Sequence, residues 1–291
     1  MIDILHERIG FMIGIIDVGG GTRGIFGAGV FDFCMDNDIN FAYVIGVSAG
    51  SANGSGYLSH QPRRNLKFYD EYAFRKEYMS LGQFIKTGNY INLDYVYSTL
   101  SNSDGEDPFD YETMKRNPAV FEIVATDALS GKAEYFSKDH MRKDYYDCIK
   151  ASCCVPAICK PYKVNGIPYY DGGMSDPIPY QRAFDMGCDR LVIILTRPKD
   201  MFRKPEKDKK IAAMIRRKYP NAAKVIADRG NLYNAQMKEI LSLEKDGRVL
   251  IVAPDEIGQM KTLTKNHKTL RAMYQKGYHA AKNIPAFLEN S

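Results

Sequence analysis

The segment Gly46-Val47-Ser48-Ala49-Gly50 decides the expected fold of this chain. It ends a short apolar run that begins at Phe41, and small residues follow it at positions 51 to 56. Glycines on both sides of a serine remove the Cβ atoms that would collide in a sharp strand-to-helix turn. The segment therefore predicts a nucleophile elbow, in which Gly46 and Gly50 let Ser48 stand at a helix N-terminus, where negative charge is stabilised. A plain turn would satisfy the same pattern, so the prediction depends on whether other motifs in the sequence supply the remaining parts of a catalytic site.

A second strand–loop–helix unit precedes the elbow. Residues 11–18 form a β-branched run typical of a buried strand, and the glycine-rich stretch 19–24 follows it directly. Residues 25–35 then have the apolar spacing of a helix. Two such units in succession indicate a parallel sheet with helices on both faces. Further strands are expected at 121–125, 133–136, 162–170, 190–195 and 249–253, with hairpin turns at 129–132 and 164–166.

The expected architecture is a three-layer α/β/α domain around a central, mostly parallel sheet. The chain has 291 residues, of which 45% are hydrophobic, enough for a large core. We expect a catalytic domain over 11–200 and a mostly helical C-terminal extension over 201–291 packed on it, with a soft boundary. The aromatic-rich region 61–117 is either a helical cap over the site or a set of ordinary helices on the sheet.

Composition excludes several other classes of protein. Six cysteines in a chain of this length do not make a disulfide scaffold and fit a reduced intracellular protein. Residues 1–10 and the short apolar run after them lack the pattern of a secretion signal, and no apolar run is long enough to cross a membrane. Four cysteines lie within 148–159 without a Cys-x-x-Cys pair or a histidine, so we expect buried thiols and no metal. A cytoplasmic location is expected.

Charge is divided unevenly along the chain. Residues 1–200 carry 21 Lys and Arg against 26 Asp and Glu, whereas residues 201–291 carry 19 against 9. The run 203–218 holds eight basic residues, with Ile211, Met214 and Ile215 expected on one side. This basic third could contact an anionic membrane surface, or it could be a solvated helix face. No nucleic-acid partner is expected, and no pattern indicates an oligomeric state.

A third candidate site is Asp171-Gly172-Gly173, at the end of an expected strand. With it, the chain resembles the patatin-like phospholipase family. The family's glycine-rich oxyanion motif appears as Gly19 to Gly24, and its nucleophile motif as Gly46 to Gly50. Its Ala-Ser-x-x-x-Pro segment matches 151–156, and its Asp-Gly-Gly motif matches 171–173. The resemblance covers about residues 11–200 and implies a Ser–Asp dyad that hydrolyses acyl esters of lipids without a histidine or a cofactor.

Residue chemistry supports the same assignment. Ser48 would be the nucleophile, and Asp171 would accept its proton and later activate water. Gly172 and Gly173 would leave room around the carboxylate. The oxyanion site would be built from Gly19, Gly20, Gly21, Thr22, Arg23 and Gly24, with the N–H groups of residues 20–22 as donors. Arg23 would either brace the loop or contact a phosphate headgroup.

Other functions remain open at this stage. Gly19-x-Gly21-x-x-Gly24 also fits a dinucleotide-binding loop, but the second expected strand ends in Ser48 and not in an acidic residue. A standard α/β-hydrolase would need His267 or His279 to complete a triad, and it would have more strands ahead of its nucleophile. A storage or lipid-binding protein of the same fold, with weak or vestigial esterase activity, is the alternative from another class.

Overall fold

A computed structural model describes residues 11–289 of the chain. The expectation that residues 1–10 hold no secretion signal falls outside the described residues. Among residues 11–289, no helix is both long enough and apolar enough to cross a membrane.

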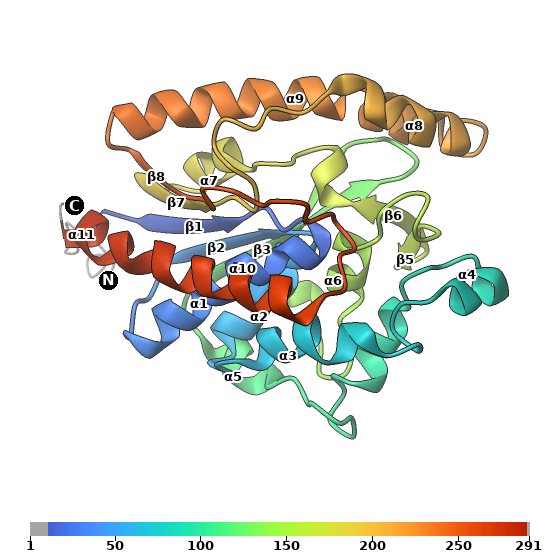
Figure 1. The fold of residues 1–291 in the computed structure, drawn as a ribbon, viewed down its shortest axis with the longest axis horizontal. Helices are drawn as coiled ribbons and strands as arrows, with labels where there is room; N and C mark the ends of the chain where they lie inside the picture. Colours follow the sequence, from blue (N-terminus) through green and yellow to red (C-terminus); the bar gives the residue numbers. More distant parts are fainter. Residues whose placement is uncertain (1–10, 290–291) are drawn as a thin grey trace, which may run out of the picture.

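A single mixed sheet organises the molecule (Figure 1). Its strands are β1 (Ile13–Asp17), β2 (Tyr43–Val47), β3 (Val120–Asp127), β4 (Ala133–Ser137), β5 (Tyr162–Val164), β6 (Ile167–Asp171), β7 (Arg190–Ile194) and β8 (Val249–Val252). They lie in the order β5-β6-β3-β2-β1-β7-β8, and β4 pairs with β3 off this path. The neighbouring strands β3, β2, β1, β7 and β8 pair in parallel. Strands β4 and β6 each pair antiparallel with β3, and β5 pairs antiparallel with β6.

Helices cover both faces of the sheet. They are α1 (Ile25–Asp36), α2 (Ala49–Leu58), α3 (Arg64–Asp70), α4 (Leu81–Thr87), α5 (Tyr111–Arg116), α6 (Asp147–Ser152), α7 (Tyr180–Asp185), α8 (Lys209–Ile215), α9 (Pro220–Lys245), α10 (His267–Ala280) and α11 (Ile284–Glu289). In Figure 1 α1, α2 and α10 lie below the sheet, and α7, α8 and α9 lie above it. The predicted three-layer α/β/α fold is confirmed.

The strands are apolar on both faces because both faces are buried. Along β1, Ile15 packs in the core shared with α1, and the next residue, Ile16, packs in the core shared with α9. Val44 and Ile45 on β2 divide in the same way. Side chains of a strand point alternately to the two faces of the sheet, so each of these short strands contributes to the hydrophobic cores on both faces.

Helix α1 is buried at every position from Ile25 to Met35, and not on one face alone. The reason is a second helix, α10, which packs along it. Gly29 and Gly277 allow the close approach, since a Cβ on Gly29 would lie 2.2 Å from the Tyr274 carbonyl oxygen and one on Gly277 would lie 2.0 Å from the Phe26 carbonyl oxygen. Residues from the two ends of the chain thus form one core.

The C-terminal third is joined to the sheet. Strand β8 pairs in parallel with β7, which confirms the strand expected at 249–253. Helix α9 contributes Tyr233, Met237 and Ile240 to the core of one face, and α10 covers the other. The domain boundary near residue 200 stays a prediction.

One expectation in this third is wrong. Met214 was placed with Ile211 and Ile215 on the inward side of a helix, but its side chain is 68% exposed while Ile215 is buried. Helix α8 ends at Ile215 after only two turns. Its buried positions are Ala212 and Ile215, and one residue's rotation carries Met214 away from α9.

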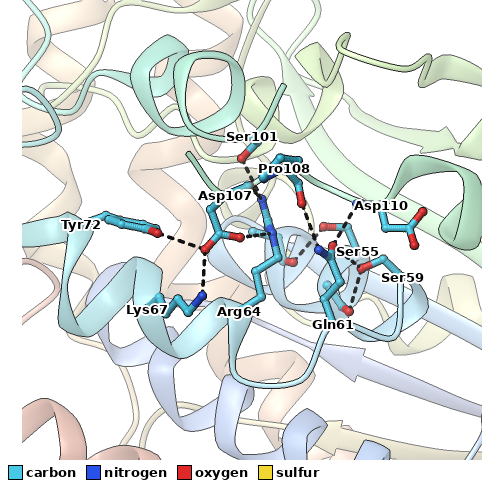
Figure 2. Close-up of polar contacts among 12 residues, drawn as sticks. Ser55, Ser59, Gln61, Arg64, Lys67, Tyr72, Ser101, Asp107, Pro108 and Asp110 are labelled. Carbon is cyan, nitrogen blue, oxygen red and sulfur yellow. Dashed lines mark hydrogen bonds and ion pairs between the residues drawn. The ribbon is translucent and has the colours of Figure 1, made fainter. Parts of the chain in front are cut away.

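Region 61–117 forms a wall beside the sheet, held by a network of polar contacts (Figure 2). The Arg64 guanidinium donates to Ser101 Oγ at 3.0 Å and to the Asp107 carbonyl at 2.9 Å, and it is paired with the Asp107 carboxylate. Tyr72 also donates to that carboxylate, and Gln61 ties the Pro108 carbonyl to the end of α2. The loop 100–110 is therefore fastened to α3.

Candidate active site

The turn after β2 has the strained geometry of a nucleophile elbow. Ser48 has φ 56° and ψ −129°, a conformation that non-glycine residues rarely adopt. A Cβ on Gly46 would lie 2.4 Å from the Ser51 Cα, and one on Gly50 would lie 2.1 Å from the Asp17 carbonyl oxygen. Both glycines are therefore required by space, and the predicted elbow is present in the structure.

Ser152, at the end of α6, supports the elbow from behind. Its hydroxyl accepts a hydrogen bond from the Ser48 N–H at 2.9 Å and donates to the Val124 carbonyl at 2.6 Å. The serine of the Ala-Ser-x-x-x-Pro segment thus ties the elbow to β3. Sequence reasoning had assigned this residue no role.

The glycine-rich loop after β1 lies against the elbow. Gly19, Gly20 and Gly21 all have positive φ angles, of 62°, 127° and 61°. A Cβ on Gly19 would lie 2.2 Å from the Val47 carbonyl oxygen and 2.8 Å from the Gly50 nitrogen. Only glycine fits here, and the loop is brought next to the N-terminus of α2.

The backbone N–H groups of this loop are not all free. The Gly19 N–H donates to Asp17 Oδ1 at 2.8 Å, and the Thr22 N–H donates to the Thr262 carbonyl at 2.8 Å. Within residues 11–289 the N–H groups of Gly20 and Gly21 have no such intramolecular acceptor. The predicted oxyanion site therefore narrows to these two donors, because the third, on Thr22, is engaged in this structure.

A buried carboxylate that the sequence did not single out braces this loop. Asp17, fully buried at the end of β1, accepts hydrogen bonds from the Gly19 N–H and from the Asn53 side-chain amide. Asn53 also donates to the Gly24 carbonyl, and Tyr69 donates to Asn53. Burial raises the pKa of Asp17 to about 6, although both hydrogen bonds lower it. An acid two residues before three consecutive glycines is the signal that the sequence offers.

Asp171 is held beside Ser48 at the end of β6. It is 5% exposed, and its Oδ1 accepts a hydrogen bond from the Gly173 N–H at 2.8 Å. Burial raises the pKa of Asp171, and the hydrogen bond from the Ser48 side chain lowers it in part. A Cβ on Gly172 would lie 2.2 Å from the Val124 carbonyl oxygen. Ser48 and Asp171 thus line the same cavity.

Two cavities meet at Ser48. The first, the apolar pocket, has a volume of about 80 Å³ and is lined mainly by aromatic and aliphatic side chains, including Tyr69, Met79, Leu93, Tyr97, Ile149 and Ile158. The second, the basic cavity, has a volume of about 470 Å³ and contains Arg23, Arg197, Arg203, Arg229 and Lys261 in its walls, together with Asp171. Region 61–117 therefore forms a wall of the apolar pocket.

The other candidate residues lie away from this junction. Among the described residues, no histidine lines either cavity. His267 stacks on Phe74 and contacts Asp70 through Nδ1 at 2.9 Å. All six cysteines are buried and free, and no cluster in residues 11–289 could hold a metal ion.

The match to known proteins agrees with this arrangement. Residues 18–184 match the family model described as patatin-like phospholipase, and the chain belongs to that family. Residues 219–289 match a separate model, a domain of unknown function (DUF6363).

Individual relatives extend the picture. The chain is 32% identical over 199 residues to the uncharacterized protein YjjU of Escherichia coli (strain K12), covering 67% of this chain and 54% of that protein. It is 22% identical over 175 residues to an uncharacterized NTE family protein of Mycobacterium bovis, covering 60% of this chain and 46% of that one. The chain thus spans about half the length of the curated relatives it matches. VipD from Legionella pneumophila matches 96% of this chain and 67% of its own, with 13% identity and a TM-score of 0.49.

Proposed function

We propose that this protein is a serine acyl hydrolase that cleaves ester bonds of phospholipids or related lipids through a Ser48–Asp171 dyad. The observation that carries the proposal is that Ser48, in its strained turn, and the buried carboxylate of Asp171 line the same cavity. Family membership supports the reaction class. The positions of Gly20 and Gly21 support an oxyanion site.

The proposed reaction has two steps. In the first, Ser48 Oγ attacks the ester carbonyl and transfers its proton to Asp171. The N–H groups of Gly20 and Gly21 stabilise the oxyanion, each donor contributing about 3 kcal/mol in comparable sites. The protonated Asp171 then gives its proton to the departing alcohol. In the second step Asp171 takes a proton from water, whose oxygen attacks the acyl-enzyme, and then returns that proton to Ser48 Oγ as the bond from Ser48 to the acyl group breaks and the fatty acid is released.

Burial suits Asp171 to this role. A carboxylate with an ordinary pKa is a weak base, and burial raises the pKa of Asp171. The nearby guanidinium groups of Arg229 and Arg203 act in the opposite direction and lower this pKa in part. The net rise makes Asp171 a stronger base than an exposed carboxylate.

A panel of chromogenic esters and phospholipids tests the proposal. Wild-type protein is expected to hydrolyse members of the panel, and Ser48→Ala is expected to be inactive on all of them. Ser59→Ala is the matched control, because Ser59 is a buried serine at the end of α2 that lines neither cavity. No turnover by wild type on any acyl ester would favour a storage or lipid-binding protein of this fold instead.

We also propose peripheral contact with an anionic lipid surface through the basic C-terminal third. Lys209, Lys210 and Met214 of α8 are exposed, which supports the idea. Sedimentation with anionic and with neutral vesicles tests it. Equal binding to the two would refute electrostatic docking.

A further inference from the structure

The basic cavity holds more positive charge than the protein itself neutralises. Four arginines, Arg23, Arg197, Arg203 and Arg229, line it beside Ser48. Of these, Arg229 is paired with Asp208 through two hydrogen bonds of 2.9 and 2.5 Å. No ion pair within residues 11–289 joins any of the other three to a carboxylate.

Arg23 is the most deeply placed of these cations. It is 4% exposed, its Nη1 donates to Thr262 Oγ1 at 3.1 Å, and its buried Nε has no hydrogen-bond partner in the part of the chain that the structure describes. Burial, followed by repulsion from Arg197 and Arg203, lowers the pKa of Arg23 to about 9. The guanidinium lies against the glycine loop, since a Cβ on Gly20 would be 3.1 Å from its Nη2. It is therefore adjacent to the proposed oxyanion donors.

Arg203, which also lines the basic cavity, likewise lacks a carboxylate partner within residues 11–289. Its backbone is fixed by two hydrogen bonds with Asn234 of α9, and its guanidinium lies over the Tyr233 ring, 4.8 Å from the centroid. Among the described residues, its buried Nε has no hydrogen-bond partner. Packing and backbone contacts thus hold Arg203 in place while this donor remains unpaired.

Buried charges without partners are expensive, and like charges that share a cavity repel each other. Such an arrangement is retained when an anion completes it. Several guanidinium groups around one cavity match the oxygens of a phosphoryl group, to which arginine donates in a planar, bidentate manner. A single carboxylate would satisfy fewer of these donors.

We propose that Arg23, Arg197 and Arg203, with Arg229 at the edge, form a binding subsite for the phosphoryl group of the substrate. Building on the proposed function, the acyl chain would lie in the apolar pocket, the ester at Ser48, and the phosphoryl group in the basic cavity. The substrate class is then an acyl ester with a phosphate close to the scissile bond. Glycerophospholipids and their lysolipids have this chemistry.

Binding is measured first, without turnover. The thermal midpoint Tm of Ser48→Ala is followed during titration with inorganic phosphate, and with chloride at matched ionic strength. A ligand that binds only the folded state raises Tm, so a saturable rise with phosphate beyond that with chloride is expected. The rise should disappear in Ser48→Ala combined with Arg197→Gln and Arg203→Gln, and persist with Arg217→Gln, an exposed arginine of the same chain. Equal responses to phosphate and chloride would overturn the subsite.

The apo proteins provide a second readout that a purely structural role would not give. If Arg203 is an uncompensated cation awaiting a ligand, Arg203→Gln should leave the Tm in chloride unchanged or raise it. If its role is structural, the Tm should fall. A lower Tm together with an unaltered phosphate response would refute the proposal.

A substrate arm separates a lipid headgroup from free phosphate. The KM of a lysophospholipid is compared with that of a neutral monoacylglycerol of the same chain length. In Arg197→Gln/Arg203→Gln, we expect KM to rise roughly tenfold for the phosphorylated ester alone, equivalent to about 1.4 kcal/mol. Equal changes for both esters would show that only free phosphate binds, against the proposal. If the protein is not the proposed hydrolase, wild type will turn over neither ester, and the phosphate titration will be unaffected.

Discussion

Two buried arginines on either side of Ser48 show how different its two cavities are. Arg64 lines the apolar pocket and is 8% exposed, and Arg23 lines the basic cavity and is 4% exposed. Arg64 is paired with Asp107 and donates to Ser101 (Figure 2), whereas Arg23 donates to the Thr262 hydroxyl and has no carboxylate partner among the described residues. At equal burial, one guanidinium is neutralised by the fold and the other is not.

The difference indicates that Arg64 has a structural role, whereas Arg23 is available for recognition of a ligand. On the apolar side the polar groups are used up in fastening region 61–117 to α3, which leaves an apolar surface beside the nucleophile. On the basic side, Arg23, Arg197 and Arg203 line the same cavity as Ser48, and no ion pair within residues 11–289 joins them to a carboxylate. A lipid ester presents the same division between chain and headgroup, so the two cavities together match an amphipathic substrate.

The largest expected effect comes from replacing Asp171, the proposed base for every ester substrate. Asp171→Asn should lower kcat by about 10³- to 10⁴-fold, as removal of one member of such a unit does elsewhere. The loss should be equal for neutral and for phosphorylated esters, because both use one dyad. Asp185→Asn, at an exposed helix end, is the control. A loss confined to one ester class would contradict a shared dyad.

A smaller loss of activity is expected from removing the Ser152 hydroxyl, which supports the turn at Ser48. Ser152→Ala leaves the Ser48 N–H buried without its acceptor, which should cost about 1 to 3 kcal/mol of unfolding free energy. Because the elbow is then less rigid, kcat should fall for both ester classes while KM stays nearly constant. Denaturant titration and steady-state kinetics measure the two effects. An unchanged kcat would show that Ser152 has no positioning role.

Altering the apolar side alone should change chain-length preference. The apolar pocket, at about 80 Å³, is smaller than the roughly 150 Å³ engineered cavity that admits benzene, so short acyl chains should be preferred. Leu93→Ala should shift the optimum to longer chains and cost about 2 to 5 kcal/mol of stability.

Leu191→Ala provides the matched control for that change. Leu191 is equally a buried leucine, but it packs on the opposite face of the sheet and lines neither cavity. It should lower stability without moving the chain-length optimum. If both variants move the optimum alike, the apolar pocket is not the acyl site.

The smallest expected effect links the basic side to the dyad through pH. Since burial raises the pKa of Asp171, kcat/KM should fall as the pH drops through a value above the ordinary carboxyl range. The charge of Arg203 lowers the pKa of Asp171, so Arg203→Gln should move this acidic limb to higher pH. A neutral ester is used to exclude headgroup effects. No movement, relative to Arg217→Gln, would mean that the two groups do not interact.

Much of the site could be predicted because its parts are local in sequence. Gly46 to Gly50, Gly19 to Gly24 and Asp171 to Gly173 each record a steric requirement that only glycine satisfies. The parallel sheet followed from apolar runs that are buried on both faces.

The remainder depends on contacts between distant segments. Arg23, Arg197, Arg203 and Arg229 are ordinary cations in the sequence, and only the packing of α9 and the loop before α10 against the glycine loop gathers them into one cavity. The engagement of the Thr22 N–H by Thr262 has the same origin. Met214 was misplaced because a helix of two turns is too short for its spacing to fix an inward face.

Covalent labelling of Ser48 tests the central claim most directly. Wild-type protein is treated with a fluorophosphonate probe, and the modified peptide is located by mass spectrometry. One adduct on Ser48 is expected, absent from Ser48→Ala and slowed in Asp171→Asn. An adduct on another residue, or ester hydrolysis that survives both substitutions, would contradict the account.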